Sequence, residues 1–246
     1  MHAPWLSNDD FDTIAKGNLN ANDKIRYRCT NYPDKYDQAK VEYIKNNYKA
    51  KIPGLEIGMD IAFSDRIVAN AAEIKSQGFD FVEYNLETAF DGPNSDADAK
   101  DNVEKVRRAA EAVHAQGMTF KVAPGKPNST SFFRTGLLDD VAKLVDQYHI
   151  QAQSIQDTTS AEYASFTEQI TKALRAANPS IVVTSQISPS QGAQPGGTLQ
   201  ETMRSCIAAA MAKQPPGNTN GFGMWIGGDY VAEAKAFYSW FKQTTL

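Results

Sequence analysis

Three polar side chains, Glu83, Asn85 and Glu87, occupy every second position in the segment FDFVEYNLE (79–87). Residues two apart in a β-strand point to the same face, so the three side chains would form one row. The intervening residues are apolar or aromatic, as expected of the face that packs on helices. Polar groups aligned inside a protein are costly unless they hydrogen-bond to one another or to a ligand. The row therefore predicts either a site of acid–base chemistry and ligand binding or a buried polar network that only stabilises the core.

Other kinds of catalytic centre are disfavoured by the residues available. The three histidines are His2, His114 and His149, and the last two fall within or at the end of predicted helices, which argues against a Ser-His-Asp triad and against histidine-ligated zinc. Cys29 and Cys206 are too few for a thiolate zinc site or a disulfide framework, and we expect two separate thiols. No glycine-rich phosphate-binding turn occurs. We therefore expect neither a cofactor nor a bound metal.

Short apolar runs alternate with amphipathic segments along most of the chain, which is typical of a parallel sheet covered by helices. The predicted strands are 24–32, 55–63, 79–87, 118–125, 150–157, 181–188 and 221–228. The predicted helices are 34–49, 66–78, 102–117, 137–149, 163–179, 198–214 and 229–243. The segment 198–214 begins with Thr198 and has Glu201 three residues later, which fits a capping box.

The spacing of these elements favours an α/β fold of the (β/α)8 TIM-barrel type. The strand starts give a repeat of about 33 residues, and eight repeats would need about 265 residues, slightly more than the 246 present. We therefore expect one domain over 1–246, with regular β/α repeats over 54–246 and an irregular N-terminal part over 1–53 that leaves the barrel short of one regular unit. An open doubly wound sheet is the alternative, but such a sheet usually carries a glycine-rich phosphate turn after its first strand.

In such a barrel the functional face lies at the carboxyl ends of the strands. This rule selects further candidates for substrate binding, namely Asp60, Gln153, Gln186 and Trp225. Lys121, within a predicted barrel strand, is a further candidate.

Several of these side chains have a structural interpretation as well. Asp60 could cap the helix that begins near Ser64, and Lys121 could form an ion pair with Glu83 or Glu87. A nearby loop holds Asp91, Asp96 and Asp98, which could bind Mg²⁺ or Ca²⁺ or could simply be solvated.

The segment D80-F-V-E83-Y-N85-L-E87 resembles the D-x-x-D-x-D-x-E strand of family 18 glycoside hydrolases, the chitinase-like barrels. The segments FKVAPG (120–125), IQAQSIQD (150–157) and GFGMWIGGDY (221–230) are similar to later strands of that family, so the resemblance covers roughly residues 79–230. Two of the family's aspartates are replaced by Glu83 and Asn85, and Ile155 stands where the family has a tyrosine. The Asn85-x-Glu87 pair is instead similar to that of family 85 endo-β-N-acetylglucosaminidases.

The resemblance implies roles for individual residues. Glu87 would protonate the glycosidic oxygen as general acid. Asn85 would position the acetamido group of the substrate, and Glu83 would hold Asn85 by a hydrogen bond. The remaining sugar contacts would come from Gln153, Gln186 and Trp225, with the indole stacking on a pyranose ring.

Three functions follow as alternatives. The first is hydrolysis of a β-linked glycan that can include N-acetylated sugars, and the second is glycan binding by a chitinase-like protein without catalysis. The third is a metal-assisted hydrolase that uses the barrel carboxylates. The expected partner is an oligosaccharide or polysaccharide.

Composition argues against two other kinds of partner. The 25 basic and 29 acidic residues give a net charge of -4, which disfavours nucleic acid. No apolar run reaches about 18 residues, so no membrane span is expected. The opening MHAPWLSNDDFD has no basic region followed by an apolar core, so no signal peptide is recognised, and the localisation stays open, extracellular after processing included.

Overall fold

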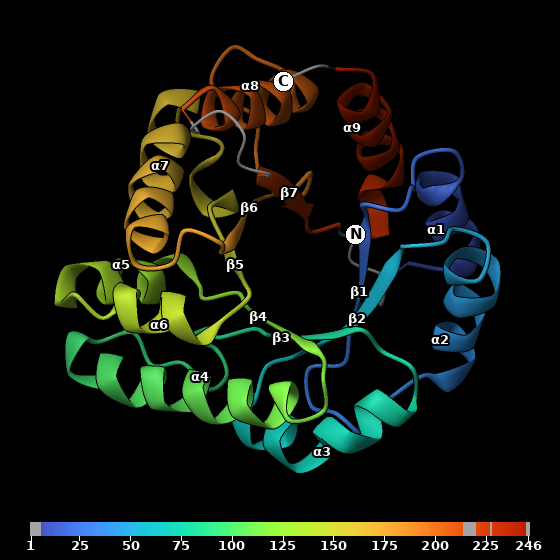
Figure 1. Ribbon diagram of the computed structural model, residues 1–246. Coiled ribbons are helices and arrows are strands. Elements are labelled where there is room, and N and C mark those ends of the chain that lie inside the picture. Colours follow the sequence, from blue (N-terminus) through green and yellow to red (C-terminus); the bar gives the residue numbers. More distant parts are fainter. Residues whose placement is uncertain (1–5, 214–219, 227, 245–246) are drawn as a thin grey trace.

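The computed structural model describes residues 6–213, 220–226 and 228–244, and their strands form one curled parallel sheet (Figure 1). The strands pair strictly in chain order. They are β1 (Lys24–Arg28), β2 (Glu56–Ile61), β3 (Phe81–Tyr84), β4 (Thr119–Val122), β5 (Gln147–Ile150), β6 (Val182–Ile187) and β7 (Asn220–Met224). Two predicted positions lie outside the described residues. They are His2, one of the three histidines, and residue 227, in the last predicted strand.

Helices surround the sheet on its outer side (Figure 1). They are α1 (Asn8–Ala15), α2 (Gln38–Ile44), α3 (Ser64–Ser76), α4 (Ala99–His114), α5 (Lys126–Thr135), α6 (Leu138–Leu144), α7 (Ser160–Ala177), α8 (Leu199–Ala212) and α9 (Val231–Gln243). A π-helical turn (Lys45–Lys49) continues α2, and 3-10 turns occur at Asp96–Asp98, Gln153–Ile155 and Gly228–Tyr230. The predicted capping box of α8 is confirmed, because Thr198 and Glu201 satisfy each other's backbone N–H groups. None of the helices in the described part of the chain is long and apolar enough to cross a membrane.

The TIM-like arrangement is therefore confirmed, while eight closed strands are not found. Seven strands are present in the described residues, and the sheet runs from β1 to β7 without returning to β1. The reason lies in the irregular N-terminal part, where the described residues before residue 54 form a single strand between α1 and α2. Outside the sheet, α1 packs against α9. Lys242 in α9 bonds Asp23, just before β1, at 2.7 Å, so contacts of α9 connect the two ends of the sheet in the described residues without strand pairing.

The region 137–157 differs from the prediction. The helix predicted to run to residue 149 ends at Leu144, and β5 begins at Gln147, earlier than the predicted 150–157. Residues from Gln153 onward form a 3-10 turn instead of strand. The spacing of Tyr148 fits a helix face, but the segment gains backbone hydrogen bonds to both neighbouring strands only when extended. This shift places His149 inside the barrel rather than at a helix end.

Charged side chains share the inner face of the sheet. The register pairs Arg28 with Asp60, Asp60 with Glu83, and Glu83 with Lys121. Because paired residues of neighbouring strands point to the same side, Glu83 faces inward, as its alternation predicted. The strand ends at Tyr84, earlier than the predicted residue 87, so Asn85 and Glu87 follow it. The other face of β3 carries Val82 and Tyr84, which are fully buried in the hydrophobic core.

Gly223 lets β7 approach the His149 ring closely, and its replacement by alanine tests this contact. A Cβ at residue 223 would lie 2.0 Å from His149 Cε1, whereas one at Gly221 would meet only Thr184 Cγ2, at 3.3 Å. We expect Gly223→Ala to lower the free energy of unfolding by about 1–3 kcal/mol through overpacking. Gly221→Ala is the matched control and should change it less in urea unfolding. Equal effects of the two substitutions would contradict the close approach.

Candidate functional site

The amide of Gln151 joins the two distal members of the β3 row. Its Nε2 donates to Asn85 Oδ1 at 2.8 Å, to Glu87 Oε1 at 3.1 Å and to the carbonyl oxygen of Ala123 at 2.8 Å. Gln153 Nε2 in turn donates to Gln151 Oε1 at 3.3 Å. All these residues follow the carboxyl ends of β3, β4 and β5, where the functional face of a parallel barrel lies. We call Asn85, Glu87, Gln151 and Gln153 the rim cluster.

Asn85 is the member of the rim cluster with an unused donor. Its side chain is 3% exposed, and its Nδ2 has no hydrogen-bond partner among the described residues. A buried polar atom left in this way costs about 1–3 kcal/mol, so it marks a place where a ligand acceptor would be stabilising. Glu87 is half-buried, in contrast to Asn85. The cluster thus offers one fixed amide donor beside one carboxyl group that solvent reaches.

Arg28, Asp60 and Trp225 also lie at the carboxyl ends of their strands. The Arg28 guanidinium lies over the Trp225 ring, 5.0 Å from its centroid. Asp60 is 1% exposed, and burial raises the pKa of its carboxyl group, against the opposing effect of Arg28 and Arg26. At Ser64, where Asp60 was expected to cap the helix, Asp91 accepts the hydrogen bonds from the backbone and the hydroxyl at 2.8 and 2.7 Å.

Glu83 belongs to a different part of the barrel from the rim cluster. It is 2% exposed and pairs with the Arg26 guanidinium. The expected hydrogen bond between Glu83 and Asn85 is not formed. Glu83 accepts from Arg26 instead, and Asn85 accepts from Gln151. The acidic row is therefore divided, with Glu83 facing the interior and the other two residues at the rim.

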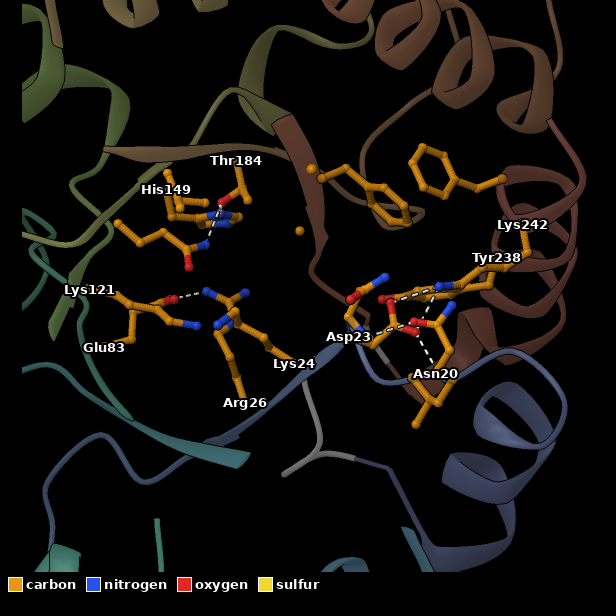
Figure 2. Close-up of a pocket in the computed structure, with 18 residues that line it drawn as sticks. Asn20, Asp23, Lys24, Arg26, Glu83, Lys121, His149, Thr184, Tyr238 and Lys242 are labelled. Atoms are coloured by element: carbon orange, nitrogen blue, oxygen red, sulfur yellow. Dashed lines mark hydrogen bonds and ion pairs between the residues drawn. The ribbon is translucent and has the colours of Figure 1, made fainter. Parts of the chain in front are cut away.

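Glu83 lines a cavity of about 340 Å³ inside the barrel, which we call the lower cavity. Its mouth carries residues before or at the start of β1, such as Asn20 and Asp23, so it opens toward the amino ends of the strands, opposite the rim cluster. Figure 2 shows Lys121, Glu83, Arg26 and His149 on one side of the cavity and Asn20, Asp23, Tyr238 and Lys242 on the other. Lys121 is 1% exposed, and its Nζ lies 3.2 Å from the centroid of the Phe81 ring.

Side-chain hydrogen bonds fix the tautomer of His149, and burial keeps its ring neutral. Thr184 Oγ1 lies 2.6 Å from His149 Nδ1, and Gln186 Oε1 lies 2.7 Å from Nε2. Since an amide oxygen only accepts, Nε2 carries the proton and Nδ1 accepts from the threonine hydroxyl. Burial, with Arg26 nearby, lowers the pKa of His149 to about 3. Gln186, expected to bind a sugar hydroxyl, thus has its side-chain oxygen engaged inside the barrel.

This depressed pKa makes stability depend on pH. Between the ordinary value of 6.5 and about 3, the unfolded chain binds a proton that folded His149 does not, so the free energy of unfolding falls as the pH falls through this window. We expect His149→Gln to lose that part of the pH dependence in urea unfolding measured from pH 7 to pH 4. His114→Gln, on the surface of α4, is the control and should retain it. An unchanged profile in His149→Gln would contradict the assignment.

The carboxylates of the loop before α4 have protein partners. Asp91 bonds Ser64 and Tyr84, and Asp96 forms an ion pair with Arg134 at 2.6 Å. Asp98 bonds Ser95. Within the ranges that the structure describes, no group of three or more His, Cys, Asp and Glu side chains is arranged to hold a metal ion. No observation therefore favours the metal-assisted alternative.

Comparison with known proteins identifies the fold and no family. No family model and no curated protein matches the sequence. A GH18 chitinase from Pseudoalteromonas aurantia superposes with a TM-score of 0.66 at 12% identity, covering 98% of each chain. The catalytic domain of a GH18 chitinase from the fern Peteris ryukyuensis gives 0.61 at 13% identity, over 98% of this chain and 96% of that one.

Other barrels are similar to a comparable degree. A putative deoxyribose-phosphate aldolase from Toxoplasma gondii ME49 gives a TM-score of 0.61 at 14% identity, over 97% of this chain and 92% of that one. The carboxyl transferase domain of Rhizobium etli pyruvate carboxylase gives 0.54 at 13% identity, and the chain spans only 34% of that protein's length. At these identities the similarity defines a class, the TIM-like parallel β/α barrels, whose members carry out several reactions.

The sequence identified some of these residues and missed others. Asn85, Glu87 and Gln153 come together at the rim as one cluster, while Glu83 and Lys121 line the lower cavity. Gln151 was missed because the strand was predicted to run to residue 157, whereas β5 ends at Ile150 and Gln151 directly follows its carboxyl end. Its alternation with Gln147 and His149 was the available signal. Both cysteines are buried free thiols, as expected.

Proposed function

We propose that this protein hydrolyses a β-linked glycan containing N-acetylated sugars, with the rim cluster as its active site. The observation that carries the proposal is the Gln151 amide, which hydrogen-bonds both Asn85 and Glu87 and so holds an amide and a carboxyl group side by side. Glu87, half-buried at the carboxyl end of β3, is the general acid that protonates the glycosidic oxygen. The similarity in fold to two GH18 chitinases over nearly the whole chain supports this class of substrate.

Asn85 positions the substrate in this scheme. Its Oδ1 accepts from Gln151, so its orientation is fixed and its Nδ2 is the group left for the sugar. That donor suits an acetamido or hydroxyl oxygen, both of which accept hydrogen bonds. Gln151 acts as a positioning residue, and Gln153 supports it from the following turn. The acetamido group of the substrate then serves as the nucleophile, as in substrate-assisted glycosidases.

A panel of substrates tests the proposal. The protein is incubated with chitooligosaccharides, N-glycans and plain β-glucans, and new reducing ends are measured together with product masses. Hydrolysis confined to the N-acetylated substrates is the expected result. Cleavage of plain glucans with equal efficiency would remove the role of the acetamido group, and no turnover of any substrate would overturn the proposal.

Glycan binding without catalysis is the second candidate, and the surroundings of Trp225 favour it. Arg28 lies over the indole ring, so sugar stacking on that face requires the guanidinium to move aside. Ile155, at the position where the resemblance places a tyrosine, lies in a 3-10 turn and offers no hydroxyl. Saturable binding of chitooligosaccharides by calorimetry, with no products after prolonged incubation, would support this candidate over hydrolysis.

A further inference from the structure

The lower cavity contains a lysine whose amine has no carboxylate of its own. Lys121 is 1% exposed on β4, and its Nζ lies against the face of the Phe81 ring. The nearest candidates for an ion pair are engaged elsewhere, because Glu83 pairs with Arg26 and Glu56 pairs with Lys24. Among the described residues, no hydrogen bond or ion pair of Lys121 Nζ accompanies the ring contact.

The surroundings of this amine disfavour its charged form. Burial is the largest cause, and the positive charges of Lys24 and Arg26 add to it, against the opposing attraction of Glu83 and Glu56. Together they hold the pKa of Lys121 well below its usual value. An unprotonated lysine amine, desolvated and close to other cations, is a nucleophile toward carbonyl carbon.

The cavity has the size and lining to admit a small organic molecule. Its volume of about 340 Å³ falls in the range of known small-molecule sites, about 300–1,000 Å³. Phe222 and Phe241 supply an apolar wall, with ring centroids 4.5 Å apart. Gly221 and Gly223 line the same space without side chains. His149 and Thr184 provide polar groups near the lysine (Figure 2).

We propose that Lys121 forms a reversible imine with a small aldehyde or ketone bound in the lower cavity. The Nζ lone pair attacks the carbonyl carbon, and a C–N bond forms while the carbonyl π bond breaks. One amine proton moves to the oxygen to give the carbinolamine. The hydroxyl group then leaves with the second amine proton as water, and a C=N bond remains. Nothing is oxidised or reduced, and hydrolysis returns the amine and the carbonyl compound. The apolar wall favours an aromatic or aliphatic substituent on the carbonyl carbon.

This activity is separate from glycan hydrolysis. The lower cavity opens at the amino ends of the strands, and the rim cluster lies at their carboxyl ends. No residue of the rim cluster lines the cavity. Imine formation would therefore persist when the carboxyl group of Glu87 is removed. Failure of the imine proposal would not contradict glycan hydrolysis, and failure of glycan hydrolysis would not contradict the imine proposal.

Reductive trapping tests the proposal on the wild-type protein. The protein is treated with benzaldehyde and sodium cyanoborohydride at pH 7, and the modified lysines are located by peptide mass spectrometry at early times. An exposed lysine with a pKa near 10.4 is almost wholly protonated at this pH. We expect Lys121 to be labelled at least about ten-fold faster than the exposed Lys100 on α4, because burial lowers the pKa of Lys121 and so raises the unprotonated fraction of its amine. The preference should disappear when the protein is unfolded in urea.

Two variants give the controls. Lys121→Met should lose the fast label, whereas Lys143→Met, at an exposed lysine in the last turn of α6 that does not line the cavity, should retain it. Labelling of surface lysines with Lys121 unmodified would overturn the proposal, as would equal rates for Lys121 and Lys100. Because the site of labelling is read on the wild-type protein, the result decides the question even if Lys121→Met does not fold.

Discussion

Replacing Glu87 by glutamine should lower the rate of glycan hydrolysis by about 10²–10⁴-fold, the contribution of a positioned general acid. The substitution is nearly isosteric, and an amide oxygen at residue 87 can still accept the hydrogen bond from Gln151. The rim cluster should therefore keep its geometry and lose only its transferable proton. Initial rates on the best substrate of the panel measure the effect, and calorimetry on the same substrate should show that binding persists.

The matched control for this prediction is Glu111→Gln, an exposed carboxyl group on α4 that pairs with Arg107. It should leave turnover unchanged. Unaltered hydrolysis by Glu87→Gln would remove Glu87 from the mechanism. Binding by both proteins with no hydrolysis by either would instead support the non-catalytic glycan-binding candidate.

Replacing Arg26 by methionine should lower the free energy of unfolding by about 3–5 kcal/mol, because it leaves the Glu83 carboxylate buried without its partner. Arg26 is 7% exposed and Glu83 is 2% exposed, so bulk solvent compensates poorly for the missing hydrogen bond. A loss of this size is a large share of the total stability of a typical domain, about 5–15 kcal/mol. Urea unfolding at pH 7 measures it.

The double substitution Arg26→Met with Glu83→Met should recover most of the loss, because it removes the unpaired charge as well. The surface pair of Arg107 with Glu104 offers a comparison, and Arg107→Met should cost less than about 1 kcal/mol. A double variant as unstable as Arg26→Met alone would show that the buried charge is not the cause. The same two variants would also report on the shape of the lower cavity, which both residues line.

The local sequence pattern was sufficient for the inner face of β3. Alternation of polar and apolar residues fixed which side chains point inward, and the structure has them so. The partners of those side chains could not be derived in this way. Arg26 and Glu83 are 57 residues apart, and their contact depends on the register of β1, β2 and β3. The alternate cations of β1, at residues 24, 26 and 28, were the signal that a charged inner face would form.

The boundary near residue 147 had the largest effect on the candidate site. Leu144, Val145 and Tyr148 fit a helical face, and the same stretch alternates as a strand from Gln147 onward. Local spacing does not decide between the two, because pairing with β4 and β6 supplies the energy that favours extension. The error moved two inward side chains, His149 and Gln151, out of the predicted site. One of them belongs to the lower cavity and the other organises the rim cluster.

The contact between α1 and α9 has a consequence for the order in which the fold can assemble. Asp23, just before β1, bonds Lys242 of α9, and the two residues are 219 apart in sequence. During synthesis, α1 has no partner helix until α9 has left the ribosome. Until then the nascent chain exposes apolar side chains of α1, such as Phe11 and Ile14, and transiently exposed apolar surface makes incomplete chains prone to aggregate.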